Sequence, residues 1–272
     1  MRLLKRNKSI PFNIGVTLVV LLFLMMACSL FYTPYDPNAM EPQNRLAPPS
    51  IEHPFGTDNF GRDILSRVME GSKTAFLIGT LSVTIGLFFG FLIGAVAGYF
   101  GGWIDEIFMR FIDAMMAFPG ILLAIVLVSV FNTGMQNTII ALGIMTIPSF
   151  SRIVRSGFIQ VKEFDFVKAS KAKGAGSMRI IVKHILPNVI SSITVAVTLS
   201  FSGSVLAESG LSYLGLGVQP PDPSWGRMLK EAQPFIVSSP TYVIITGGVI
   251  MLMVLGFNLL SDGIRDLRDK KA

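Results

Sequence analysis

Cysteine, histidine and charge are all scarce in this sequence of 272 residues. The one cysteine, Cys28, excludes a disulfide within the chain. The two histidines, His53 and His184, are far apart in the sequence, so we expect no metal site built from histidine and cysteine. Charged residues make up 15% of the chain, against roughly 25% in a soluble domain. The composition is therefore not that of an ordinary soluble domain.

The sequence also lacks the motifs of an enzyme that hydrolyses nucleotides. In Gly71-Ser72-Lys73-Thr74, a serine stands where a nucleotide-binding P-loop needs a glycine directly before the lysine, and the earlier glycine of that motif is missing. No combination of nucleophile, base and acid is evident elsewhere. We therefore predict that the chain is not an enzyme and that it binds no cofactor itself.

Long apolar runs are what the sequence has instead. Hydrophobic residues make up 51% of the chain, and its mean hydropathy is +0.61. Apolar runs of about 20 residues predict membrane-spanning helices, because a helix satisfies its own backbone hydrogen bonds in lipid. The short fourth run contains Pro148, and we expect it to continue as a helix through residues 151–159. The predicted fold is an all-α membrane protein with six transmembrane helices, approximately at residues 16–32, 75–99, 108–131, 138–150, 189–206 and 242–260.

The distribution of Lys and Arg predicts the orientation in the membrane. Most of these 23 residues lie in the two terminal segments and in the loop between the fourth and fifth runs. Because Lys and Arg are enriched in cytosolic segments, both termini and this loop are predicted to face the cytosol. The same enrichment accounts for the net charge of +6 without nucleic acid binding. A cleaved signal sequence is the alternative for the first run, but that run continues past Cys28 to Tyr32.

Two of the segments predicted to lie outside are long, at residues 33–74 and 207–240. In the second, Tyr213 and Trp225 are suited to anchor the segment at the membrane interface. In the first, four apolar residues have the spacing of an amphipathic helix lying at the interface, namely Ile64, Leu65, Val68 and Met69.

These segments suggest a division of the chain into two parts. Residues 1–73 hold an N-terminal cytosolic tail, the first transmembrane helix and the first outside segment. Residues 74–272 form a core of five transmembrane helices, interrupted by the polar segment 163–187.

Glycine recurs every four residues in the second apolar run, at Gly86, Gly90, Gly94 and Gly98. That spacing produces a ridge without side chains along one side of a helix, which lets a neighbouring helix approach closely. We interpret the ridge as a helix-packing surface. A substrate path lined by backbone is the alternative.

Three further residues are candidates for a translocation path or its gate: Asp113, Pro119 and Glu208. Asp113 is expected to pair with Arg110, because residues three apart share a helix face. Pro119 is expected to kink the third span. Glu208 is placed just outside the fifth span, where a solvated helix end is the alternative to a contact along a path.

The polar segment 163–187 between the fourth and fifth runs is the most informative part of the chain. It is too long for a tight turn and too short for a domain. Its composition predicts a helix over residues 167–173, a break at Gly174 and Gly176, and a second short helix over residues 178–186 that is capped by Ser177. Such an element fits a groove on a cytosolic partner, and attraction to anionic membrane lipid is the alternative.

This segment resembles the EAA loop of ABC-importer permeases, whose pattern is E-A-A, three residues, Gly, nine residues and I-x-L-P. Lys168-Ala169-Ser170 stand at E-A-A, and His184 stands at the Ile. Lys168, Ser170 and His184 depart from the pattern, so the contact of the family's glutamate does not carry over. The resemblance implies coupling to a separate ATPase subunit through Val167, Lys168, Ala169, Ser170, Lys171, Lys173, Gly174, Ala175, Gly176, Leu186 and Pro187.

Four other segments, at residues 53–68, 109–119, 184–188 and 211–229, resemble the dipeptide/oligopeptide/nickel permease family, and within it the "C" type of subunit. The resemblance implies a type I ABC-importer permease fold with a cytosolic coupling helix, in a prokaryotic cell membrane. It implies ATP-driven import of dipeptides or oligopeptides. The partners would be a similar permease in a heterodimer, two ATPase subunits that bind ATP and Mg²⁺, and an extracytoplasmic binding protein.

Other functions stay open at this point. A nickel or metal–chelator importer of the same family is the first alternative. A stand-alone channel or secondary carrier is less favoured, because the centres of the predicted spans lack ionisable residues. If the two outside segments form the landing surface of a binding protein, charge reversal at Arg62 and Arg227 is predicted to weaken its docking.

Overall fold

The computed structural model describes residues 10–269, and this part of the chain is helical apart from its loops and one isolated bridge between Thr57 and Asp63. A π-helical segment, Ile181–Ile185, joins α7 to α8, and short 3₁₀ turns lie at Pro42–Asn44 and Gln233–Phe235. The α-helices are α1 (Ile10–Ser29), α2 (Ile64–Phe100), α3 (Gly102–Met116), α4 (Gly120–Phe131), α5 (Met135–Lys162), α6 (Asp165–Ala172), α7 (Ser177–Ile180), α8 (Leu186–Leu214), α9 (Trp225–Ala232) and α10 (Pro240–Asp269).

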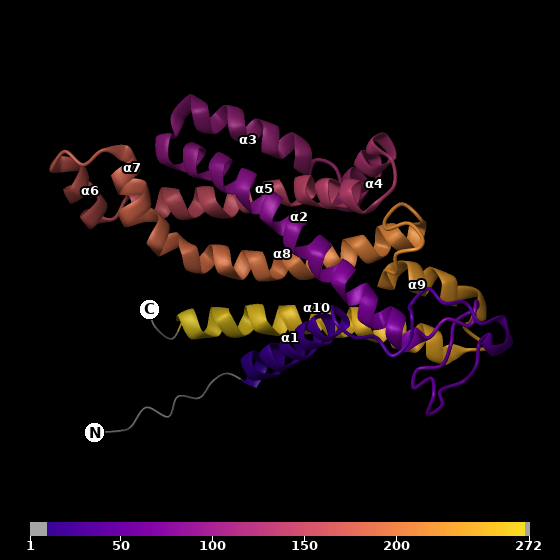
Figure 1. Ribbon diagram of the computed structural model, residues 1–272. Coiled ribbons are helices and arrows are strands. Elements are labelled where there is room, and N and C mark those ends of the chain that lie inside the picture. Colours follow the sequence, from indigo (N-terminus) through magenta and orange to yellow (C-terminus); the bar gives the residue numbers. More distant parts are fainter. Residues whose placement is uncertain (1–9, 270–272) are drawn as a thin grey trace, which may run out of the picture.

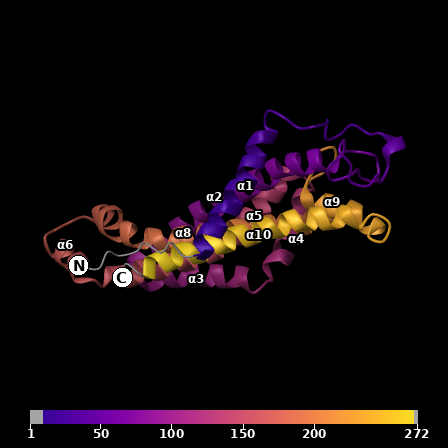
Figure 2. The same ribbon diagram turned by 90° about the horizontal axis from the view of Figure 1, so that it is seen from below.

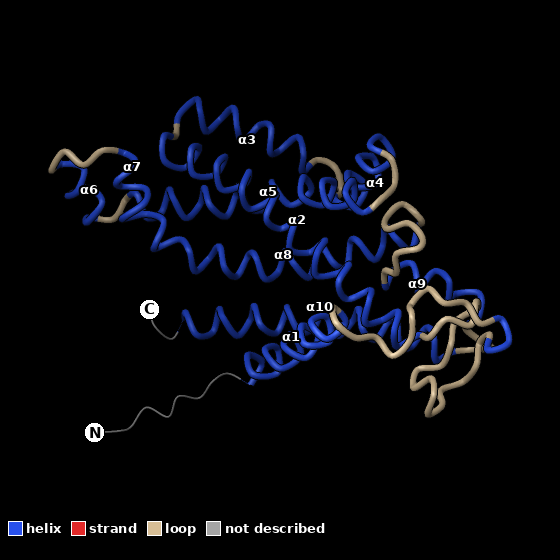
Figure 3. The backbone as a smooth tube through the Cα atoms, viewed as in Figure 1, coloured by secondary structure: helices blue, strands red, loops and turns tan. Residues whose placement is uncertain are grey.

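The molecule is elongated and has two distinct ends (Figures 1 and 2). One end carries α6 and α7 and is called the α6 end below. The opposite end, the α9 end, carries α9 and the long loop formed by residues 33–63. Figure 3 shows most of the loop structure gathered at the α9 end, beyond the long helices.

Five helical segments are long and apolar enough to cross a membrane, and a sixth span arises if α3 and α4 are counted together. The prediction of an all-α protein with six spans therefore agrees with the described residues. The third span is not a kinked helix, however, because α3 and α4 are bent by 86° relative to each other. Pro119 precedes the first turn of α4 and has no backbone N–H to continue the hydrogen bonding of α3.

The prediction of a separate amphipathic helix at the membrane interface is wrong, because its residues belong to the long helix α2. Asp63 caps α2 by accepting a hydrogen bond from the Ser66 N–H, and the helix runs for 37 residues from Ile64. Ile64 and Val68 are buried in a core cluster and do not face lipid headgroups. The proposed division after residue 73 falls inside this helix.

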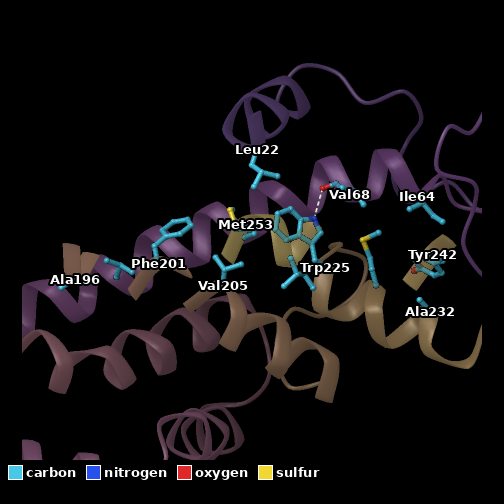
Figure 4. Close-up of a cluster of buried hydrophobic side chains, with 14 of the residues drawn as sticks. Leu22, Ile64, Val68, Ala196, Phe201, Val205, Trp225, Ala232, Tyr242 and Met253 are labelled. Carbon is cyan, nitrogen blue, oxygen red and sulfur yellow. Dashed lines mark hydrogen bonds between the residues drawn. The ribbon is translucent and has the colours of Figure 1, made fainter. Parts of the chain in front are cut away.

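The core at the α9 end is built around Trp225, which is 1% exposed. Its indole N–H donates to the Val68 carbonyl oxygen over 3.0 Å, which ties α9 to α2 (Figure 4). Val205 of α8 and Met253 of α10 complete the surroundings of this cluster. Trp225 is therefore a core residue, and its prediction as an interfacial anchor is wrong.

Candidate functional site

The segment 163–187 lies at the α6 end, beyond the ends of the long helices (Figure 1). Asp165 in the first turn of α6 and Lys171 in its last turn each match the helix dipole at that position. The helix ends before Gly174, whose φ of +81° is a left-handed conformation that favours glycine. The predicted helix and its break at Gly174 therefore lie where the sequence placed them, with α6 beginning two residues earlier.

One apolar side chain holds α6 against the rest of the protein. Val167 is 3% exposed and belongs to a core cluster with Phe158 of α5, Ile180 of α7 and Ile185. The remaining predicted coupling residues on α6 and the following turn are exposed or half-buried: Lys168, Ala169, Ser170, Lys171, Lys173, Gly174, Ala175 and Gly176. The segment thus has a small hydrophobic anchor and a surface that combines polar side chains with exposed apolar ones, Phe164, Phe166, Met178 and Val182.

The residues that depart from the EAA pattern make contacts within the segment. The Ser170 hydroxyl lies 3.2 Å from Nε2 of His184, so two of the departures contact each other. The third, Lys168, pairs with Glu163 over 3.0 Å. The hydrogen bond from Lys168 lowers the pKa of the Glu163 carboxyl below its ordinary value. Because Lys168 and Glu163 are exposed, the pair orients the lysine without adding much stability.

The second half of the segment is continuous with the fifth span. The residue at the N-cap of α7 is Gly176, with no side-chain hydrogen bond, so the prediction of a cap by Ser177 is wrong. Residues Ser177–Leu214 form one continuous helical stretch without a loop, in which the π-helical segment separates α7 from α8, whose first residues are Leu186 and Pro187. Pro187 cannot donate a backbone hydrogen bond to the preceding turn, and the π-helical segment ends two residues before it. A force on α7 therefore acts directly on α8.

The four glycines of α2 lie against α5. A Cβ atom on Gly90 would lie 2.5 Å from Cβ of Phe150, and one on Gly98 would lie 2.8 Å from the Arg155 carbonyl oxygen. A Cβ on Gly86 would collide with the Thr146 hydroxyl, and one on Gly94 would lie 2.5 Å from the Ser151 carbonyl oxygen. The spacing thus gives a close approach of two helix backbones.

We expect Gly94→Leu to separate α2 from α5 and to lower the free energy of unfolding by about 3 kcal/mol or more. The new side chain would meet backbone atoms of α5, and these cannot move aside as the end of a flexible side chain can. Thermal unfolding of the detergent-solubilised protein measures the effect. Gly248→Leu on α10 is the control, since a Cβ there meets no atom within 4 Å. Equal stability of the two variants would contradict this packing role.

One ion pair within α3 and one between α3 and α5 replace the pairing that the sequence predicted. Arg110 pairs with Glu106 over 2.6 Å, and Asp113 pairs with Arg152 over 2.6 Å, so the predicted pair of Arg110 and Asp113 is wrong. Asp113 is exposed, and its role in a path or gate stays a prediction. A second such pair joins Arg155 of α5 to Asp105 of α3 in a bidentate contact.

A buried ion cluster fastens the loop at residues 33–63 to α9. Arg62 donates to Asp58 over 2.6 Å and to Glu231 over 2.7 Å. Arg67 lies between the same carboxylates and donates to the Pro37 carbonyl oxygen over 3.0 Å. Arg62 and Arg67 are 7% and 1% exposed. Arg62 is therefore unsuitable as a landing residue for a partner, contrary to the prediction from the sequence.

Glu208 is buried, which corrects its prediction as a residue just outside the fifth span. It lies inside α8 and is 1% exposed. Its carboxylate accepts a hydrogen bond from the Ser212 hydroxyl over 2.6 Å, and Ser212 in turn accepts from the Val218 N–H over 3.0 Å. This chain of bonds fixes the turn that follows α8, so the geometry gives Glu208 a positioning role.

A cavity of about 470 Å³ lies where α3 breaks into α4. Pro119 and Gly120 at the break, Pro148 of α5 and Gly203 of α8 contribute to its wall. Broken helices inside a membrane are tolerated where they line a cavity or pack against protein, and such breaks often mark binding sites. Of the three candidates for a path or gate, Pro119 is the one that borders this cavity.

Known proteins resemble both the sequence and this fold. The family model of the binding-protein-dependent transport system inner membrane component matches residues 90–272. The dipeptide transport system permease protein of Alkalihalophilus pseudofirmus is 43% identical over 98% of this chain and 88% of its own. The glutathione transport system permease proteins of Pectobacterium atrosepticum and an Escherichia coli strain are 41% and 43% identical, each over 93% of this chain and 84% of theirs.

Solved structures resemble the fold at low sequence identity. An inward-facing structure of the MetNI methionine ABC transporter matches 76% of this chain and 95% of its own, with a TM-score of 0.56 and 20% identity. An amino acid ABC transporter matches 73% of this chain and 90% of its own, with a TM-score of 0.55 and 18% identity. With these matches and the apolar helices above, the chain belongs to the family of binding-protein-dependent transport system inner membrane components, as a multi-pass permease subunit of an ABC importer.

Proposed function

We propose that this chain is the permease subunit of an importer of short peptides. The observation that carries the proposal is its 43% identity, over 98% of its length, to a dipeptide permease. Similarity over most of the chain to glutathione permeases supports the same class of cargo, since glutathione is itself a small peptide. Peptide is thus the cargo chemistry that these two groups of relatives share.

In this proposal, α6 is the coupling helix that docks on an ATPase subunit. Its exposed basic side chains, the exposed Phe166 and the buried apolar anchor at Val167 suit a groove on a partner. ATP and Mg²⁺ bind in two such ATPase subunits and not in this chain. Because no loop separates α7 from α8, closure of the ATPases moves α8 together with the coupling segment.

The proposed orientation places the α6 end and both termini in the cytosol. The Lys and Arg residues of segment 163–187 support it. The α9 end then faces outward and receives the binding protein, and a similar permease completes a heterodimer in the membrane. Fully exposed apolar side chains at the α9 end, Ile51 and Val237, are candidates for the landing surface in place of Arg62.

Uptake by a strain lacking this gene tests the proposed cargo. We expect loss of uptake of a labelled dipeptide or a labelled longer peptide, restored by the gene on a plasmid, with uptake of radioactive nickel unchanged. The size of the peptide whose uptake is lost identifies the kind of peptide importer. Loss of nickel uptake alone would overturn the peptide assignment while leaving the family and the fold in place.

A further inference from the structure

The cavity at the break between α3 and α4 has a wall suited to an uncharged organic group. Its volume, about 470 Å³, lies within the range of about 300–1,000 Å³ that small-molecule sites occupy. The described lining residues include no charged side chain, and three of them are methionines, Met115, Met116 and Met145, whose flexible side chains adapt to different shapes. A hydrated metal ion would find no carboxylate or imidazole among these residues.

A buried hydroxyl in the same wall has no partner among residues 10–269. Ser204 lines the cavity and is 0% exposed, and its oxygen makes no hydrogen bond there. Other hydroxyls of α8, those of Thr194 and Thr198, donate back to a carbonyl oxygen four residues earlier. Leaving a buried polar group unpaired is costly, so Ser204 is a group that a ligand would satisfy once a movement at the break between α3 and α4 exposes its oxygen to the cavity.

The start of α4 adds further donors beside this hydroxyl. The first N–H groups of a helix have no partner within the helix. In α4 the N–H groups of Leu122 and Leu123 donate to the Pro119 carbonyl oxygen, and Pro119 offers no side-chain hydrogen bond to those of Gly120 and Ile121. Gly120 begins α4 and lines the cavity. The wall therefore combines an apolar surface with polar groups from α4 and α8. This composition is that of a site for a molecule that has both apolar and polar groups.

We propose that this cavity is a cargo subsite, in which an apolar side chain of the passing peptide packs against the methionines while its main chain bonds to Ser204 and the start of α4. The inference rests on the proposed peptide import and specifies where this subunit contacts the cargo. The subsite lies at the break of the third span, so a change in the angle between α3 and α4 would change its shape.

Gly203 offers a way to fill the cavity without disturbing the fold. It lines the cavity, and a Cβ atom added there meets nothing within 4 Å. We expect Gly203→Leu to lower the ratio of Leu-Phe uptake to Gly-Ala uptake about tenfold or more. The introduced leucine side chain would occupy the volume that a bulky side chain of the dipeptide fills in the wild type. Uptake is measured with the complete transporter and its binding protein in proteoliposomes, so that selection by the binding protein is the same for every variant.

Gly210→Leu is the matched control on the same helix. A Cβ at Gly210 also meets nothing within 4 Å, but this residue borders a different cavity, beside Leu206 and Tyr213. We expect it to leave the ratio of Leu-Phe to Gly-Ala uptake unchanged. An unchanged ratio in Gly203→Leu, or an equal change in both variants, would overturn the subsite. Failure of the wild type to take up either peptide would instead overturn the proposed function, and the subsite with it.

A second readout measures occupation of the cavity instead of uptake. In a Cys28→Ser background, the thiol introduced by Gly203→Cys is the single cysteine of the chain and can be modified by a maleimide. We expect Leu-Phe to slow this modification during turnover by about fivefold or more, whereas the thiol of Gly210→Cys reacts at the same rate with and without peptide. Equal protection at both positions, or none at Gly203→Cys, would contradict the subsite.

Discussion

Replacing Gly174 with proline is expected to leave the permease in the membrane while uptake falls by about 5- to 150-fold, the range of typical coupling free energies. Gly174 has a φ of +81°, whereas the proline ring holds φ near −65°. Its N–H also donates to the Lys171 carbonyl oxygen over 3.0 Å, and proline has no N–H. The turn that follows α6 must therefore be rebuilt, and α6 loses its place against α7.

Uptake and ATP hydrolysis are measured in the same vesicles. We expect ATP hydrolysis to continue in the Gly174→Pro variant while uptake is lost. Gly176→Pro is the control in the same loop, because Gly176 has a φ of −67° that proline adopts readily. Normal uptake in Gly174→Pro would contradict a coupling role for α6. Equal loss in both variants would show that the loop tolerates no proline and would contradict the specific role of the Gly174 turn.

Local features of the sequence predicted much of this site. The break after α6 depends on Gly174 itself, and the contact between α2 and α5 depends on glycines four residues apart, so neighbouring residues carry the signal. The family pattern marked the segment 163–187 as the candidate coupling segment for the same reason. Pro119 also indicated where the third span departs from a straight helix, but the sequence predicted a kink and not a break of 86°, because the packing of α3 and α4 on α5 sets how far the span is bent.

Features that depend on distant residues were missed. The sequence suggested that Arg62 lies on the surface, because its partner Glu231 is 169 positions away and nothing near Arg62 in the sequence indicates the contact. The bidentate pair of Arg155 and Asp105 joins residues 50 positions apart, and no short motif marks it. Glu208 was placed outside a span because an apolar scan ends before it, although α8 continues past it and three serines surround its carboxylate. One signal was available: an acidic residue among serines at helical spacing indicates a satisfied buried carboxylate.

Charge reversal at Arg62 is expected to prevent stable folding of the α9 end. Removing one partner of a buried ion pair costs about 3–5 kcal/mol, and Arg62→Glu would also bring a third carboxylate beside Asp58 and Glu231. The variant should accumulate poorly in the membrane and unfold at a lower temperature in detergent. Arg227→Glu is the comparison, because Arg227 is partly exposed and its single pair with Glu231 contributes about 1 kcal/mol at most.

The double variant Arg62→Glu/Glu231→Arg separates structure from docking. If the cluster acts by holding the loop at residues 33–63 on α9, exchanging the two charges restores one opposite-charge contact and part of the stability, and a double-mutant cycle measures that coupling. If Arg62 were a landing residue, Arg62→Glu would fold normally and bind the binding protein weakly, and the exchange would not rescue docking. Because Arg62 is 7% exposed and held by two carboxylates, we expect the first result. Docking of the binding protein should then decrease only in proportion to the fraction of the protein in which the α9 end is unfolded.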